Sequence, residues 1–95
     1  MSGSTRCSRV TVTLNNKHGL HARPAHLWVQ TANSFAASLR VGRPSGEKVD
    51  GKSIMGIMML AAERGTMLEI ESEGPDCDQQ IRALQDLVAS QFGED

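Results

Sequence analysis

The spacing of apolar residues predicts four strands and three helices in a single small domain. Val10, Val12 and Leu14 alternate with threonines, the two-residue period of a half-buried strand. After a loop at 15–19, apolar residues recur at helical spacing from Pro24 onward, which predicts a helix of about three turns. The pattern then predicts, in order, strands at 38–41 and 47–50, a short helix from Ser53 to Gly65, a strand at 67–72 and a last helix opening at 74–76.

The order of these elements, β-α-β-β-α-β-α, predicts the fold class α+β. Thr11, Thr13, Glu69 and Glu71 give one face of the sheet a polar surface, so the helices are expected to cover only the other face. We place this domain at 9–95 and expect 1–8 to form a flexible N-terminal extension.

Composition limits the classes of function. A chain of 95 residues with 39% hydrophobic residues can build one small core, but not the walls of a deep pocket as well, which favours a surface site. The net charge of -1 without a basic stripe, together with one Trp and two Phe, argues against nucleic-acid binding.

We expect neither a secretory signal nor a membrane span in this chain. The stretch 1–9 lacks the apolar core of a secretory signal, and the longest mostly apolar run, 54–62, is far shorter than the roughly 20 residues of a membrane span. The two cysteines match no metal-binding spacing. We therefore expect a cytoplasmic protein with reduced thiols and no cofactor.

The segment 19–24 (GLHARP) contains the most informative residues of the chain. It places His21 at the start of the first helix, where the free amides of Ala22 and Arg23 would point outward and the helix dipole adds roughly half a positive charge. Such a helix start binds anions. The guanidinium of Arg23 could hold phosphoryl oxygens through two N–H bonds.

This placement predicts that His21 carries a labile phosphoryl group. A positive potential favours the neutral imidazole, whose ring nitrogen is a nucleophile, and the product brings negative charge to a site suited to it. An exposed site would let one protein deliver the group and another remove it. The competing interpretation is a loop histidine that merely caps a helix.

Three stretches, 19–25, 51–60 and 68–75, resemble HPr, the histidine-containing phosphocarrier family of the bacterial phosphotransferase system. The resemblance implies an open-faced β-sandwich, with a four-stranded antiparallel sheet and three helices on one face. It implies that His21 is phosphorylated at Nδ1 and that Arg23 contacts the phosphoryl group. Enzyme I would be the donor and enzyme IIA domains the acceptors, in sugar uptake or regulation. The protein would be a monomeric carrier, not an enzyme.

Ser53 precedes the short apolar helix and is expected to be its N-cap. The resemblance adds a second role, since the matching serine in relatives is phosphorylated by a dedicated ATP-dependent kinase. Regulatory phosphorylation of Ser53 by an HPr kinase/phosphorylase is therefore an expectation that the sequence leaves open.

The helix after Ser53 is apolar on nearly every side, although it can bury only one. Ile57 and Leu60 are expected to face the core. The residues that we expect to dock partner proteins are Leu20, Ile54, Met55 and Met58.

Two other functions compete with the carrier. A metal site could use His18, His21 and His26, but no acid or Cys completes the set, so we predict none. A regulatory module using only the Ser53 surface would lack the phosphorylated histidine, which is present. The sequence leaves open whether the carrier serves sugar uptake or a nitrogen-related branch.

Overall fold

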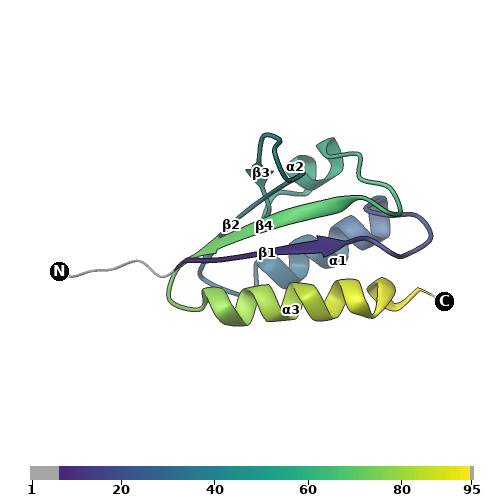
Figure 1. Ribbon diagram of the computed structural model, residues 1–95. Coiled ribbons are helices and arrows are strands. Elements are labelled where there is room, and N and C mark those ends of the chain that lie inside the picture. The colour runs from purple at the N-terminus through teal and green to yellow at the C-terminus, as the bar shows by residue number, and fades with distance from the viewer. Residues whose placement is uncertain (1–6, 95) are drawn as a thin grey trace.

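Four antiparallel strands form one sheet in the order β1-β4-β2-β3 in the computed structural model, which describes residues 7–94 (Figure 1). The elements, in chain order, are β1 (Cys7–Thr13), α1 (Ala22–Ala32), β2 (Ser38–Gly42), β3 (Val49–Asp50), α2 (Ile54–Met59), β4 (Met67–Glu73), α3 (Cys77–Ala89) and the short 3₁₀ helix η1 (Gln91–Gly93). Helices α1 and α3 lie along one face of the sheet, and α2 packs against α1 and β3. The predicted element order and α+β class are confirmed.

Several predicted boundaries differ from the observed ones, and the largest differences are in β1, β3 and α2. β1 begins at Cys7, so the expected flexible extension does not include residues 7 and 8, and its remainder, 1–6, lies outside the described residues. β3 has two residues instead of four. α2 ends at Met59 and not at Gly65, because Ala61 adopts a positive φ of 48° and turns the chain out of the helix.

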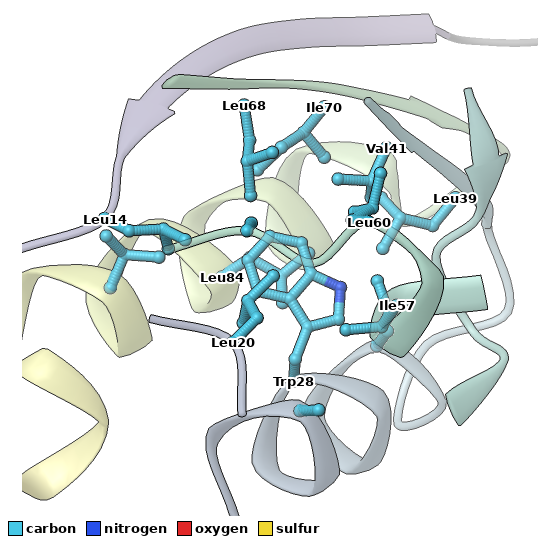
Figure 2. Packing of buried hydrophobic residues seen from close by; sticks show 14 of the residues in the cluster. Leu14, Leu20, Trp28, Leu39, Val41, Ile57, Leu60, Leu68, Ile70 and Leu84 are labelled. Atoms are coloured by element: carbon cyan, nitrogen blue, oxygen red, sulfur yellow. The ribbon is translucent and has the colours of Figure 1, made fainter. Parts of the chain in front are cut away.

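The core lies between the sheet and the helices, with Trp28 at its centre (Figure 2). Trp28 from α1 is fully buried and is surrounded by side chains from β4, α2 and α3. On β4, Leu68 and Ile70 point into this core while Glu69 and Glu71 alternate with them on the other face, as predicted. The predicted stripe of the last helix is also buried: Cys77, Ile81, Leu84 and Val88 lie on α3, and Phe92 lies beyond its end in η1. Burial of each large apolar side chain stabilises the fold by roughly 1.5–3 kcal/mol.

Gln80 is a buried polar residue that joins α3 to the end of α1. Its side-chain amide donates to the carbonyls of Ala32 and Ala37 at 3.0 and 3.1 Å, and its carbonyl oxygen accepts from the hydroxyl of Ser72. All the polar atoms of this side chain thus have partners, as burial requires.

Asp76 closes the segment between α1 and β2. Its carboxylate accepts hydrogen bonds of 2.8 Å from the backbone amides of Ala36 and Ala37. These bonds hold the pKa of Asp76 below its ordinary value because they stabilise the charged carboxylate, and the bond from Ala36 has the larger effect.

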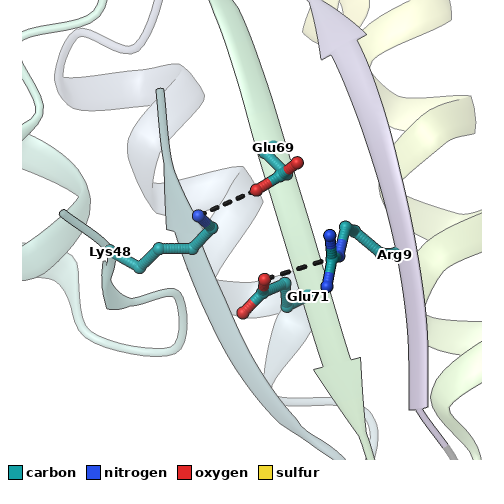
Figure 3. Close-up of polar contacts among 4 residues, drawn as sticks. All are labelled: Arg9, Lys48, Glu69 and Glu71. Atoms are coloured by element: carbon teal, nitrogen blue, oxygen red, sulfur yellow. Dashed lines mark ion pairs between the residues drawn. The ribbon is translucent and has the colours of Figure 1, made fainter. Parts of the chain in front are cut away.

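The face of the sheet turned away from the helices is polar and carries alternating charges. Arg9 pairs with Glu71 at 3.5 Å and Lys48 with Glu69 at 2.9 Å (Figure 3). The hydrogen bond from Lys48 holds the pKa of Glu69 below its ordinary value. Thr11 and Thr13 are exposed on β1, so the predicted one-sided covering of the sheet is confirmed.

Within 7–94, no helix combines the length and apolar character needed to cross a membrane.

Candidate functional site

The loop before α1 is held rigidly against the segment that follows α2. The side-chain amide of Asn16 donates to the carbonyl of Gly19 at 2.8 Å, and the backbone amide of Leu20 donates to the carbonyl of Ala62 at 2.9 Å. Gly19 has φ +61°, and a Cβ there would lie 2.3 Å from the carbonyl oxygen of Ala62. Only glycine fits this position, so Gly19 determines the backbone direction in which the chain leaves the loop and enters α1.

His21 is the N-cap of α1, as predicted. Its backbone is extended, with φ −78° and ψ −172°, and its carbonyl accepts from the amide of Ala25 at 2.8 Å. The imidazole is exposed and makes no side-chain hydrogen bond to the helix that it caps.

The first turn of α1 offers two free hydrogen-bond donors next to His21. The amides of Ala22 and Arg23 have no acceptor in the described part of the chain, and Pro24 has no N–H to contribute. With no acidic side chain in this turn, the positive end of the helix dipole is uncompensated. The arrangement suits an anion attached to His21.

Arg23 follows His21 by two residues on the first turn of α1, and its side chain is exposed. A guanidinium at this place is free to turn toward an anion on the imidazole. It does not line either of the two surface hollows beside His21.

The two hollows are shallow and differ in chemistry. One, of about 240 Å³, lies toward α2 and is lined by Leu20, His21, Met58, Ala61, Ala62 and Glu63. The other, of about 200 Å³, is lined by Lys17, His18, His21, Glu63 and Arg64. His21 therefore lines both hollows and separates a mainly apolar surface from a charged one.

Sequence reasoning missed the charged residues around the second hollow. His18, interpreted as one member of a rejected metal site, has its ring edge-on to His21, with centroids 6.0 Å apart and planes at 61°. Arg64 and Glu63 reach the site from the segment after α2. The density of basic residues at Lys17 and His18 was a usable local signal, whereas nothing near Arg64 in the sequence indicates its position.

Ser53 is the N-cap of α2, as predicted, and its hydroxyl accepts from the amide of Gly56 at 3.2 Å. The hydroxyl group is half-buried at the start of the helix. A phosphate on this oxygen would lie at the amino end of α2, beside the residues expected to meet partners.

The outer side of α2 presents methionine side chains to solvent. Ile57 and Leu60 face the core, as predicted, while Met55 and Met58 are 71% and 45% exposed and Ile54 is half-buried. Met59, which the sequence analysis did not include among the docking residues, is 74% exposed. We call Ile54, Met55, Met58 and Met59 the α2 patch.

Leu20 lies mostly below this surface. It is only 3% exposed and packs in the core with Trp28, but it also lines the hollow beside His21, so its role in docking stays a prediction. His21, which follows it, is exposed, whereas the backbone amide of Leu20 donates to the carbonyl of Ala62 and its side chain lies in the core.

No three His, Cys, Asp or Glu side chains of residues 7–94 are grouped so that they could bind a metal ion. His26 is exposed on α1, and the ring contact of the site is between His18 and His21.

Comparison with known proteins gives one consistent family. Residues 8–90 match the family described as PTS HPr component phosphorylation site. Phosphocarrier protein HPr of Neisseria meningitidis (serogroup A) is 45% identical over 84 residues, which cover 88% of this chain and 93% of that protein.

Solved structures give the same result. The crystal structure of HPr-C-His from Thermoanaerobacter tengcongensis has a TM-score of 0.88 at 46% identity, covering 93% of this chain and 98% of that chain. A crystal structure of an HPr dimer from the same organism has a TM-score of 0.72 at 48% identity, covering 90% and 97%.

Proposed function

The chain belongs to the HPr family, the phosphocarriers of the phosphotransferase system, and from this premise we propose that His21 is the residue that carries the phosphoryl group. Members of this family are carriers and not enzymes. The observation that supports His21 most directly is its exposed imidazole at the N-cap of α1, beside two amides without acceptors in the described part of the chain.

The proposed reaction is an in-line transfer between nitrogen atoms. The Nδ1 lone pair of His21 attacks the phosphorus of a phosphohistidine on the donor protein. An N–P bond forms to His21 as the N–P bond of the donor histidine breaks. The amides of Ala22 and Arg23 and the guanidinium of Arg23 then bind the oxygens of the transferred group. Transfer to the acceptor reverses these steps with a new imidazole as the nucleophile.

We propose phosphorylated enzyme I as the donor and enzyme IIA domains as the acceptors, acting in the cytoplasm, where phosphoenolpyruvate is available. Both partners must reach the same imidazole, so they would share one docking surface. The α2 patch is suited to this, because Met58 lines the hollow beside His21 and flexible thioether side chains adapt to different partners.

We further propose that phosphorylation of Ser53 regulates this transfer. The phosphate would add nearly two negative charges at the edge of the α2 patch while remaining compatible with the amino end of the helix. Incubation with an HPr kinase/phosphorylase and ATP, followed by mapping of the phosphate by mass spectrometry, tests this: label confined to residues other than Ser53 would reject the site.

We propose that the carrier acts as a monomer, since the site is complete within one chain. The sugar and nitrogen-related branches use the same chemistry on His21 and differ in which enzyme IIA accepts the group. Measuring transfer to one acceptor of each kind would assign the branch.

The decisive experiment uses enzyme I and ³²P-labelled phosphoenolpyruvate. We expect the wild type to gain acid-labile label and His21→Ala to gain none. His26→Ala is the matched control, because His26 is an exposed histidine of the same helix, and it should be labelled like the wild type. Full labelling of His21→Ala would reject the proposed function.

A further inference from the structure

The second hollow beside His21 is lined by more cationic side chains than the carboxylates of the described part of the chain neutralise. Lys17, His18 and Arg64 line it together with His21, and Glu63 is the only carboxylate in the lining. Neither Lys17 nor Arg64 forms an ion pair with another residue in 7–94. The hollow therefore has an unmatched positive charge even when both imidazoles are neutral.

His18 is placed so that an anion on His21 would come within its reach. The two rings meet edge-on with their centroids 6.0 Å apart. This distance is too long for a ring nitrogen of His18 to form a hydrogen bond directly with a ring nitrogen of His21. A phosphoryl group on His21 extends that side chain by one P–N and one P–O bond. Its oxygens would then fill the space between the rings, where an N–H of His18 could donate to them.

The residues that line the hollow beside His21 do not come from the first turn of α1. The amides of Ala22 and Arg23 belong to the helix, whereas Lys17 and His18 belong to the preceding loop and Arg64 follows α2. A tetrahedral phosphoryl group has three peripheral oxygens, and the helix start can meet only some of them. Donors in the hollow would bind the remainder.

We propose that the hollow lined by Lys17, His18 and Arg64 receives the phosphoryl oxygens on His21, with His18 as a catalytic hydrogen-bond donor to them. This inference rests on the proposed function of His21 and adds residues to it. Glu63 opposes the bound charge and limits how tightly the group is held, which suits a carrier that must release it.

The test uses phosphoramidate, a small donor that needs no partner protein. The imidazole nitrogen of His21 attacks phosphorus, the P–N bond of phosphoramidate breaks, ammonia leaves, and the ring releases its other nitrogen-bound proton to water. We expect His18→Ala to slow phosphorylation on the order of tenfold, the factor that corresponds to loss of one charge-assisted hydrogen bond. His18→Gln keeps an N–H donor and should retain most of the rate.

Two further variants distinguish an effect of the cations in the hollow from an effect of the overall charge of the protein. Arg64→Ala should slow the reaction like His18→Ala, and Arg82→Ala, an exposed cation on α3, should react like the wild type. In the wild type, phosphorylation should move the ring ¹⁵N resonances of His18 and leave those of His26 in place. This NMR measurement does not depend on whether any variant folds.

Wild-type rates for His18→Ala, or unmoved His18 resonances, would overturn the inference. Equal slowing in His18→Ala and His18→Gln would indicate loop packing and would also overturn it. If the wild type gains no phosphate on His21 from enzyme I and phosphoenolpyruvate either, the proposed function itself fails, and the inference fails with it.

Discussion

The backbone amide of Leu20 donates a 2.9 Å hydrogen bond to the carbonyl of Ala62, which joins the loop before α1 to the segment after α2. Because of this bond, Glu63 and Arg64 lie beside His21 although two helices and two strands separate them in the chain. Gly19 makes the close approach possible, since a side chain at that position would strike the backbone of Ala62 and Glu63.

Gly19→Ala should therefore damage both stability and phosphoryl transfer. The positive φ and the backbone clash together should lower the free energy of unfolding by roughly 2–4 kcal/mol. Gly65→Ala is the matched control: its φ is +90°, but no atom lies within 4 Å of the added Cβ, so only the conformational cost of about 1–2 kcal/mol applies. Urea denaturation compares the two, and equal losses would contradict the role of the close contact.

Alanine at Met55 or Met58 should weaken partner binding more than folding. Both side chains are exposed, so the free energy of unfolding should change by about 0.5 kcal/mol or less. Loss of an interface anchor costs roughly 1–2 kcal/mol of binding, and transfer to enzyme IIA at low concentration should fall about tenfold. Met67→Ala, 52% exposed on the open face of the sheet, should transfer normally. Parallel losses of stability and transfer would place Met55 and Met58 in the core.

Gln80→Leu should destabilise the domain by about 1–3 kcal/mol. The substitution leaves the buried hydroxyl of Ser72 without its acceptor. It also removes one donor each from the carbonyls of Ala32 and Ala37, which keep their bonds from the amide of Phe35 and from Nζ of Lys52. Gln79→Leu is the control on the adjacent position of the same helix, where the side chain is exposed, and should change stability by about 0.5 kcal/mol or less. Thermal unfolding followed by circular dichroism measures both, and similar melting temperatures would show that the Gln80 bonds contribute little.

Asp76 should make stability depend on pH at the acid end. Its pKa is lowered in the folded state by the amides of Ala36 and Ala37, so the unfolded state binds the proton more tightly. The contribution is therefore complete above about pH 4 and is lost as the pH falls through the folded pKa.

Asp76→Asn should be less stable than the wild type at neutral pH and should lose less stability on acidification. Asp86→Asn, at an exposed position of α3, should follow the wild-type profile. Unfolding free energies measured from pH 7 to 2 decide the matter. An unchanged acid slope in Asp76→Asn would show that other carboxylates carry the dependence.

The fold was predictable where local pattern and tertiary packing agree. The alternation at Leu68 and Ile70 and the helical stripe from Cys77 to Val88 each describe one buried face, and both are confirmed. The end of α2 was not predictable, because Ala61 and Ala62 favour helix locally and the turn there depends on the tertiary bond from Leu20. A stop at Gly65 was the better local choice and was still wrong.

The site was predictable only on its helical side. Pro24 and the loop that ends at Gly19 indicated a helix start between them. This is enough to place His21 and the first free amides of the helix. Arg64 comes to the site through the packing of distant segments, and no local pattern encodes that. The burial of Leu20 was missed for the same reason.

Trp28 gives this domain an internal optical probe. It is the only tryptophan, it lies fully buried where both long helices meet the sheet, and its indole N–H has no acceptor in the described part of the chain. An indole in such apolar surroundings emits at short wavelength and shifts toward the red when water reaches it. The fluorescence of the unmodified protein therefore reports loss of the native core directly, and each variant above can be checked for intact folding in the same cuvette as its transfer assay.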